Sequence, residues 1–225
     1  MTVSINQPAY LPWLGYLDRI KASDVFVYLD TVQFEKGSFV NRNKIKTPQG
    51  AKWLTVPVRT SGLLGNNILK ETEIAGDEWR ESHWNQIVQS YKKAPHWNRY
   101  SDAIKDTYAR PYRLLSNLCW EQLTVFLGIL GIKTTIVKSS ELPIFDSRKD
   151  ELVLDVLTYL RADDYISGKM GRGYLDEEKF RQKKITLRFQ DYKPRAYRQS
   201  GEKFMAYMAV IDLLFNEGED APNFI

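Results

Sequence analysis

Amides, aromatic rings and a carboxylate follow two short apolar runs near the start of this chain. Gln7 comes directly after the first run, and its amide can both donate and accept hydrogen bonds. Trp13 and Tyr16 come next, and their rings could stack on a planar ligand or pack a helix onto a sheet. Asp30 follows the second run, where its carboxylate could bind a substrate hydroxyl, an ammonium group or a metal, or could cap the loop. These residue types in this order indicate a site for a small polar molecule.

A cluster of positive charge follows this region. Between Lys36 and Arg59 the chain carries six cations and no carboxylate, which is +6 in a protein whose total is +4. A cluster of one sign on a folded scaffold attracts anions. Within it, Arg42 can bind a phosphate or carboxylate through two hydrogen bonds, and Lys44 and Lys46 can add charge. The competing interpretation is a basic surface loop, because runs of charge usually face solvent.

Two further candidates lie later in the chain. His83 falls on a predicted helix, and an imidazole is the usual general base near neutral pH, although a helical histidine can also be structural. Residues 166–175 carry three glycines and two cations between a short strand and a helix. Glycine backbone can approach a phosphate closely, but the Gly-Lys-Ser/Thr ending of a Walker A loop is absent. The alternative is a flexible loop.

The composition narrows the class of protein. A chain of 225 residues that is 43% hydrophobic can bury a substantial core, so we expect a single domain over residues 1–225. Cys119 is the one cysteine, which excludes a disulfide within the chain and fits a reducing compartment. The N-terminus lacks a signal peptide pattern, and no apolar run approaches about 18 residues. We therefore expect a cytoplasmic protein without membrane insertion, and the local charge does not predict nucleic acid as a partner.

The order of apolar patterns predicts an α/β fold with a mainly parallel sheet flanked by helices. Strands are predicted at residues 3–6, 25–29, 52–57, 133–138, 164–167 and 185–190. Helices are predicted at residues 14–22, 78–91, 99–109, 112–130, 149–160, 176–183 and 203–215. Residues 41–46 are interpreted as a polar loop. The all-helical stretch at 78–130 could form a cap or a subdomain within the domain.

Short motifs along the chain support a family assignment. They are Gln7-Pro8-x-Tyr10-x-Pro12-Trp13-x-Gly15-Tyr16, Asp30-x-Val32-Gln33-Phe34-x-Lys36, Asn41-Arg42-Asn43-x-Ile45-Lys46, Leu54-Thr55-Val56-Pro57-Val58, Ser167-Gly168 and Ile211-Asp212-Leu213-Leu214-Phe215-Asn216. Together they resemble the WbqC-like protein family over nearly the entire chain. This resemblance implies a setting in bacterial surface-polysaccharide gene clusters, where some members are thought to modify amino sugars with acyl or aminoacyl groups.

A second likeness concerns architecture. The segment Trp13-Leu14-Gly15-Tyr16 follows the first strand, where nucleotidyltransferases and class I aminoacyl-tRNA synthetases carry a His-x-Gly-His type signature. The loop at 167–173 is similar to their later lysine-containing loop. Both histidines are replaced here, by Trp13 and Tyr16, and in that superfamily those imidazoles stabilise phosphates.

The residues and the WbqC-like resemblance together predict an enzyme that transfers an acyl or aminoacyl group to a nucleotide-linked sugar amine. The predicted catalytic residues are His83, Asp30 and Gln7, with His83 accepting the proton of the attacking amine. The predicted substrate-binding residues are Tyr10, Trp13, Tyr16, Gln33, Asn41, Arg42, Asn43, Lys44, Lys46, Ser167, Gly168 and Tyr174. In this prediction Arg42, Lys44 and Lys46 hold the diphosphate.

The expected partners are an anionic small molecule, a carrier protein and a second copy of the chain. An acyl thioester donor or ATP is the expected cosubstrate, and no metal site is predicted because no Cys or His pair has zinc spacing. Two other functions stay open. One is a nucleotidyltransferase-like or adenylate-forming enzyme that uses ATP, and the other is a noncatalytic sugar-binding or assembly protein.

Overall fold

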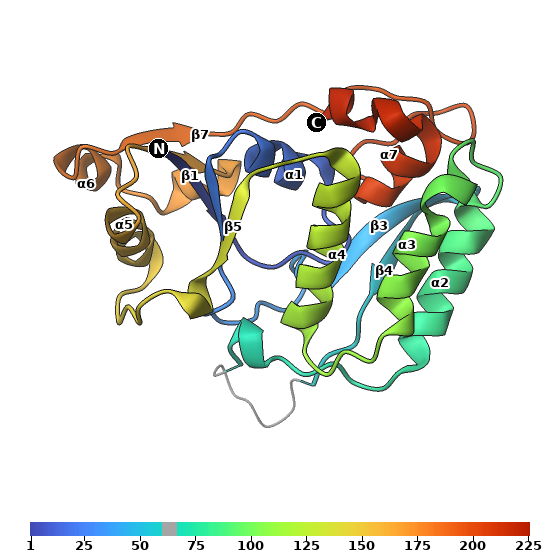
Figure 1. Cartoon of the computed structure of the whole chain (residues 1–225), viewed down its shortest axis with the longest axis horizontal. Coiled ribbons are helices and arrows are strands. Elements are labelled where there is room, and N and C mark those ends of the chain that lie inside the picture. The colour runs from blue at the N-terminus through green and yellow to red at the C-terminus, as the bar shows by residue number, and fades with distance from the viewer. Residues whose placement is uncertain (60–66) are drawn as a thin grey trace.

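A parallel sheet of five strands forms the centre of the computed structural model, which describes residues 1–59 and 67–225 (Figure 1). The strands lie in the order β5-β2-β1-β6-β7, and every neighbouring pair is parallel. Their bounds are β1 Thr2–Asn6, β2 Val25–Tyr28, β5 Thr135–Lys138, β6 Asp164–Ser167 and β7 Thr186–Phe189. The predicted α/β fold with a mainly parallel sheet is confirmed.

The remaining described elements are helices and one hairpin. The α-helices are α1 Leu14–Lys21, α2 Glu78–Tyr91, α3 Trp97–Ala109, α4 Leu115–Leu130, α5 Lys149–Tyr159, α6 Glu177–Gln182 and α7 Val210–Glu217. Short 3-10 helices are η1 Leu69–Glu71, η2 Ser139–Glu141, η3 Lys169–Gly173 and η4 Gly218–Phe224. The hairpin consists of β3 Arg42–Thr47 and β4 Gly50–Thr55, which pair antiparallel.

Helices cover both faces of the parallel sheet, as such sheets require. Side chains alternate along each strand. In β2, Phe26 and Tyr28 join the core that also contains α1 and α4, whereas Val27 joins the core that contains α5 and α6. Figure 1 shows α5 and α6 together at the left of the molecule, and α1 and α4 on the side that continues into the hairpin.

The hairpin, α2, α3 and α7 pack together at the right of Figure 1. A buried carboxylate joins them, because Asp212 of α7 accepts hydrogen bonds from Tyr91 of α2 at 2.9 Å, Tyr197 at 2.7 Å and Gln199 at 2.6 Å. The Lys46 ammonium group of β3 donates to Gln199 Oε1 at 3.2 Å. Since every member has a partner, this polar cluster can be buried and still hold the elements in one arrangement.

Whether residues 78–130 form a subdomain stays a prediction.

The structure corrects two predicted elements. The last helix begins at Val210 rather than at residue 203, because the backbone N–H groups of Ala209 and Val210 donate to Lys44 and Pro12 carbonyls at 2.8 and 2.9 Å. These long-range bonds replace the helical bonds that an earlier start would need. Residues 42–47, interpreted as a loop, form strand β3 instead.

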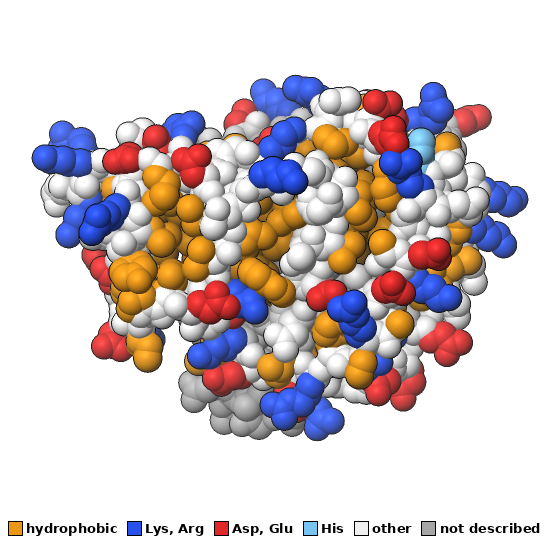
Figure 2. Space-filling view, viewed as in Figure 1, with side chains coloured by type: hydrophobic (Ala, Val, Ile, Leu, Met, Phe, Trp, Pro, Cys, Tyr) orange, Lys and Arg blue, Asp and Glu red, His pale blue; other side chains and the backbone are white. Residues whose placement is uncertain are grey.

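Figure 2 shows the same face of the molecule with its side chains. Hydrophobic side chains are visible in the middle of this face, over β5 and α4 and toward α5, and charged side chains of both signs lie around the rim. No helix among the described residues has both the length and the apolar composition needed to span a lipid bilayer.

Candidate functional site

The order of the strands identifies one place in the sheet where ligands are expected. Counted along the chain, the five strands read 3-2-1-4-5 across the sheet, which is the order of the first five strands of a doubly wound nucleotide-binding fold. The winding reverses between β1 and β6, and ligands of such sheets bind beyond the carboxyl ends of the strands at the reversal. We call this place, where Gln7 follows β1 and Ser167-Gly168 ends β6, the switch point.

The loops after β1 and β6 leave the sheet toward opposite faces at the switch point, since α1 lies over one face and α6 over the other. The strands are parallel neighbours, with Ser4 of β1 paired to Ile166 of β6. Gln7 is half-buried, and its side-chain amide makes no hydrogen bond within the part of the chain that the structure describes. Its carbonyl accepts a bond from the Tyr16 hydroxyl at 3.1 Å. Gln7 is therefore positioned by its backbone, and its amide is available to a ligand.

Two glycines of the loop after β6 pack against side chains. A Cβ on Gly171 would lie 2.1 Å from Ser167 Oγ, and a Cβ on Gly168 would lie 2.3 Å from an Arg19 terminal nitrogen. A side chain at either position would push aside the group it meets, and the absence of a side chain permits the close approach. Tyr174 follows η3 and is 51% exposed. Partial burial raises the pKa of its hydroxyl, and the Arg19 guanidinium opposes that rise.

Arg19 was not identified from the sequence. It is the charged side chain that lies against Gly168 at the switch point. It lies on α1, is 6% exposed, and its Nε has no hydrogen-bond partner. Burial lowers the pKa of its guanidinium. The signal that could have found it is its spacing, because Arg19 is three residues from Tyr16 and next to Ile20 on the apolar face of the helix.

The aromatic residues of the first loop pack within the protein. Tyr16 is 2% exposed, and its ring centre lies 5.4 Å from that of Phe26. The half-buried ring of Trp13 packs edge-on against Tyr192, at 5.5 Å between ring centres. Gly15 has no side chain where the Trp13 ring lies, since a Cβ there would be 2.3 Å from it. The alternative interpretation of these rings as packing residues fits this arrangement.

His83 lies in the core beside Tyr10. Its Nδ1 is 2.8 Å from the Tyr10 hydroxyl, which is itself 2.7 Å from the Tyr108 hydroxyl. The side chain is 5% exposed, and burial lowers its pKa to about 4. His83 is therefore neutral at pH 7 and shielded from solvent. A role for it as a general base stays a prediction, and its surroundings are those of a structural histidine.

The polar side chains of the hairpin bind the backbone around them. Asn41 donates to the Val56 carbonyl at 2.8 Å, and Asn43 donates to the Leu11 carbonyl at 2.5 Å. Lys46 is buried and donates to the Lys203 carbonyl at 2.6 Å. Asn43 and Lys46 attach the hairpin to the first loop and to the segment before α7, and Asn41 binds the residue that follows β4. These bonds explain why the three groups are polar although they are buried.

Arg42 and Lys44 lie on the opposite, outer face of the hairpin. The Arg42 guanidinium lies 4.5 Å from the centre of the Trp53 ring, and the Lys44 ammonium lies 5.5 Å from it. Trp53 is exposed, and so are its neighbour Phe39 and the more distant Gln33. The cations therefore form a cation–π surface that is separate from the switch point. The prediction that they bind a diphosphate stays untested.

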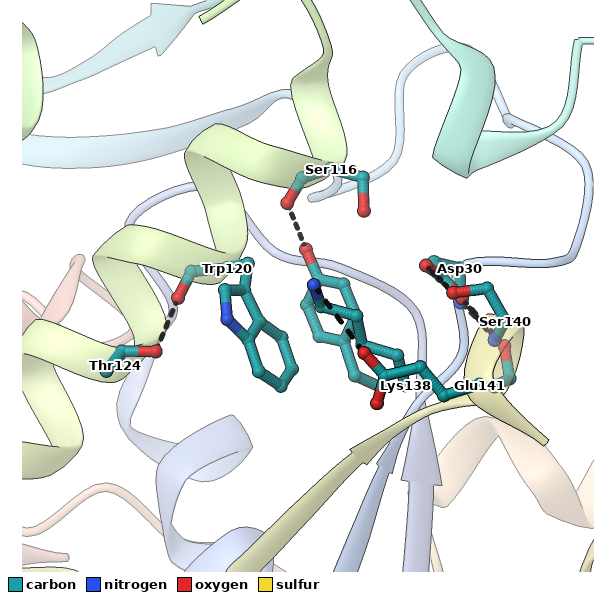
Figure 3. Close-up of polar contacts among 9 residues, drawn as sticks. Asp30, Ser116, Trp120, Thr124, Lys138, Ser140 and Glu141 are labelled. Carbon is teal, nitrogen blue, oxygen red and sulfur yellow. Dashed lines mark hydrogen bonds and ion pairs between the residues drawn. The ribbon is translucent and has the colours of Figure 1, made fainter. Parts of the chain in front are cut away.

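Asp30 joins the carboxyl ends of β2 and β5 (Figure 3). It is 3% exposed, and its carboxylate accepts the Ser139 hydroxyl at 2.9 Å, the Ser140 N–H at 2.9 Å and the Ser140 hydroxyl at 2.8 Å. Beside this cluster, Lys138 lies 4.4 Å from the centre of the Trp120 ring. Three of the acceptor positions of Asp30 are thus occupied by the protein itself, as expected for a structural carboxylate.

The structure thus brings together some of the predicted site residues and separates others. Gln7, Ser167 and Gly168 lie at the switch point with Tyr16 beneath them and Tyr174 at the rim. Tyr10 and His83 lie in the core, the buried hairpin amides hold backbone, and Asp30 braces the neighbouring pair of strands.

A comparison with family models gives the broader setting. The WbqC-like protein family matches residues 7–224. The chain belongs to the WbqC-like protein family. The uncharacterized protein Rv1507c of Mycobacterium tuberculosis is 34% identical over 225 residues, covering 99% of this chain and 96% of the relative. No solved structure matches the chain. Every switch-point residue of this WbqC-like protein lies inside the matched range.

Possible metal ligands and surface hollows do not mark the predicted site in the described part of the chain. Within residues 1–59 and 67–225 of this WbqC-like protein, no group of three or more His, Cys, Asp or Glu side chains could hold a metal ion. An open hollow of about 550 Å³ lies between α6 and β7, and one of about 280 Å³ lies beside Asp18 and Tyr192. None of the predicted site residues lines either hollow.

Replacing Asp30 tests its bracing role. Asp30→Ala removes the acceptor for three hydrogen bonds, one from the buried Ser139 hydroxyl and two from Ser140, so we expect the free energy of unfolding to fall by about 2–4 kcal/mol. Urea unfolding measures this change. Glu141→Ala in the same short helix is the matched control. Its exposed ion pair with Lys138 is 4.0 Å long, so its loss should cost below about 0.5 kcal/mol. Equal stability of Asp30→Ala and the parent protein would contradict the bracing role.

The pKa of His83 predicts a pH-dependent stability. Because the folded-state pKa of about 4 lies below the ordinary 6.5, the unfolded chain binds more protons between these values, and stability falls as the pH falls below 6.5. Between pH 7.5 and 5 we expect this group to remove about 2 kcal/mol, measured by urea unfolding. His83→Asn should unfold with a correspondingly smaller loss over the same range. A His83 ring that titrates near pH 6.5 by NMR would refute the prediction.

Proposed function

We propose that this WbqC-like protein transfers an acyl or aminoacyl group to the amine of a nucleotide-linked sugar, in the synthesis of a surface polysaccharide such as O-antigen. The observation that carries the proposal is the reversal of winding between β1 and β6 in a 3-2-1-4-5 sheet, with Gln7 directly after β1 and Gly168 directly after β6. Sheets of this order bind nucleotides at that place. The family resemblance contributes the amino sugar and the polysaccharide setting.

The exposed polar groups at the switch point suit a sugar substrate. The free amide of Gln7 can donate to one sugar hydroxyl and accept from another or from the amine. The Tyr174 hydroxyl at the rim can act as a donor, because a tyrosine keeps its proton at neutral pH and partial burial raises its pKa further. Arg42 and Lys44 on the hairpin would attract the anionic substrate at longer range.

The proposed step balances without a redox partner. The sugar amine attacks the carbonyl carbon of an acyl thioester, a C–N bond forms, and the C–S bond breaks. The proton that leaves the nitrogen goes to the departing sulfur, directly or through water. Positioning and charge stabilisation account for most of the catalysis in this scheme, which does not use His83 because of its burial.

The strand order also favours a second candidate function. A 3-2-1-4-5 sheet suits a nucleotidyltransferase-like or adenylate-forming enzyme that uses ATP. The segment Trp13–Tyr16 and the loop at 167–173 occupy the places where such enzymes carry their signature segments. Such an enzyme would release pyrophosphate from ATP and depend on Mg²⁺.

A ligand panel separates these functions. A ligand that binds only the native state at 100 times its Kd stabilises it by about 2.7 kcal/mol, which for a chain of this size raises Tm by roughly 5–10 °C. We expect UDP-linked amino sugars to raise Tm, and a thioester donor then to yield an N-acylated sugar by mass spectrometry. Stabilisation by ATP alone with release of pyrophosphate would support the second candidate instead.

Gln7→Ala tests the role of the switch point in turnover. Because the amide side chain is free of protein partners, its removal should leave Tm within about 2 °C and lower kcat/KM by roughly 10-fold or more. Gln89→Ala, on the exposed side of α2, is the matched control and should change neither quantity. Full activity of Gln7→Ala with the identified sugar would remove Gln7 from the site.

A further inference from the structure

Arg19 is a buried cation whose charge the described protein does not neutralise. It is 6% exposed, its Nε is shielded from solvent without a hydrogen bond, and it forms no ion pair with a described carboxylate. Burying a charge without a partner costs several kcal/mol, and natural proteins pair such groups or use them. The described residues therefore leave at least the Nε–H of this guanidinium without an acceptor.

The nearest acidic side chain along the chain is occupied elsewhere. Asp18 precedes Arg19 on α1, but its carboxylate accepts the Gln190 amide at 2.5 Å. The same amide donates to the Gly15 carbonyl at 2.8 Å. Gln190 thus holds Asp18 at the end of β7. Asp18 has only a minor effect on the pKa of Arg19.

The Arg19 side chain extends toward the switch point. Its backbone lies beside the middle of β1, because Ser23 Oγ is 2.8 Å from both the Arg19 carbonyl and Ser4 Oγ. Its guanidinium lies over Gly168, which follows the last residue of β6. The three atoms that a Cβ on Gly168 would approach all belong to this guanidinium, at 2.3, 3.4 and 3.7 Å. The glycine therefore leaves room for the cation at the end of the sheet.

We infer that Arg19 is the anion-binding residue of the switch point and that, with the Gln7 amide, it binds a phosphate group of the substrate. This inference rests on the proposed function, which places the substrate at the switch point. It adds a cation at that place, where Arg42 and Lys44 of the hairpin do not provide one. A guanidinium can bind two oxygens of one phosphate, and the backbone of Gly168 permits close approach. The Gln7 amide and the Tyr174 hydroxyl are further donors, and a phosphate has three oxygens to receive them.

Arg19→Met tests the inference with UDP as the phosphate probe and uridine as its phosphate-free match. We expect the Kd for UDP, measured by calorimetry, to rise at least 10-fold, and the affinity for uridine to stay unchanged. Without ligand, Tm should equal or exceed that of the parent protein, because an unpaired buried charge is replaced by an apolar side chain. Arg172→Met, which removes an exposed cation from the same loop, should change the Kd for UDP by less than 3-fold.

Gly168→Ala provides a second test that leaves the charge in place. The added methyl should displace the guanidinium and weaken UDP binding in the parent protein. In the Arg19→Met background the same change should have little further effect, since the guanidinium atoms it would meet are gone. Gly173→Ala, where a Cβ meets nothing within 4 Å, is the matched control on this loop.

The outcomes separate this inference from the proposed transfer. UDP binding that depends on Arg19, in a protein that acylates no sugar, would support the anion site and overturn the transfer. Unchanged UDP affinity in Arg19→Met, a drop of several degrees in its ligand-free Tm, or failure of the parent protein to bind UDP would each overturn the inference. Inorganic phosphate should compete with UDP for binding to the parent protein, and this competition should disappear in Arg19→Met.

Discussion

Parallel strands can be joined only by connections that cross from one end of the sheet to the other, and the rest of this structure depends on that constraint. The crossovers place α1 and α4 over one face and α5 and α6 over the other. Where the winding reverses, between the neighbouring strands β1 and β6, the two loops diverge, and Gln7 and Gly168 are the first residues of these loops. The position of the candidate site is thus a consequence of topology, and its chemistry comes from the side chains that reach it.

Two kinds of buried polar group serve different ends in this protein. Asp30, Asn43 and Asp212 each have partners for their buried oxygens or nitrogens, and each joins segments that are distant in the sequence. Such satisfied groups fix one arrangement of the fold. Arg19 differs because its buried nitrogen has no partner among the described residues. Other side chains, Arg42 and Arg80 among them, also have a buried nitrogen without a described partner, so the proposed ligand role of Arg19 depends equally on its place against Gly168 at the switch point.

Local pattern predicted most elements of the fold and fewer features of the site. Alternating apolar runs located the five strands of the sheet, and helix α2 has the bounds that its sequence pattern predicts. The amides around Asn43 seemed suited to substrate on residue type alone, yet a strand buries them against the backbone of Leu11, a contact between distant segments that no local pattern reveals. Arg19 was overlooked because an arginine on the apolar face of a helix usually extends its charge to solvent, and its burial here depends on the distant loop at Gly168.

The dependence of the first loop on the last helix has a consequence for biosynthesis. Val210 donates to the Pro12 carbonyl, Ala209 pairs with Trp13, and Asp212 receives the Tyr91 hydroxyl. A nascent chain emerging from the ribosome therefore cannot complete its N-terminal loop until its final segment has been synthesised, however early the first strands are available. Such sequence separation slows folding and leaves partly exposed interior groups in the meantime. A premature stop near the end of the coding sequence would consequently damage the region that was translated first.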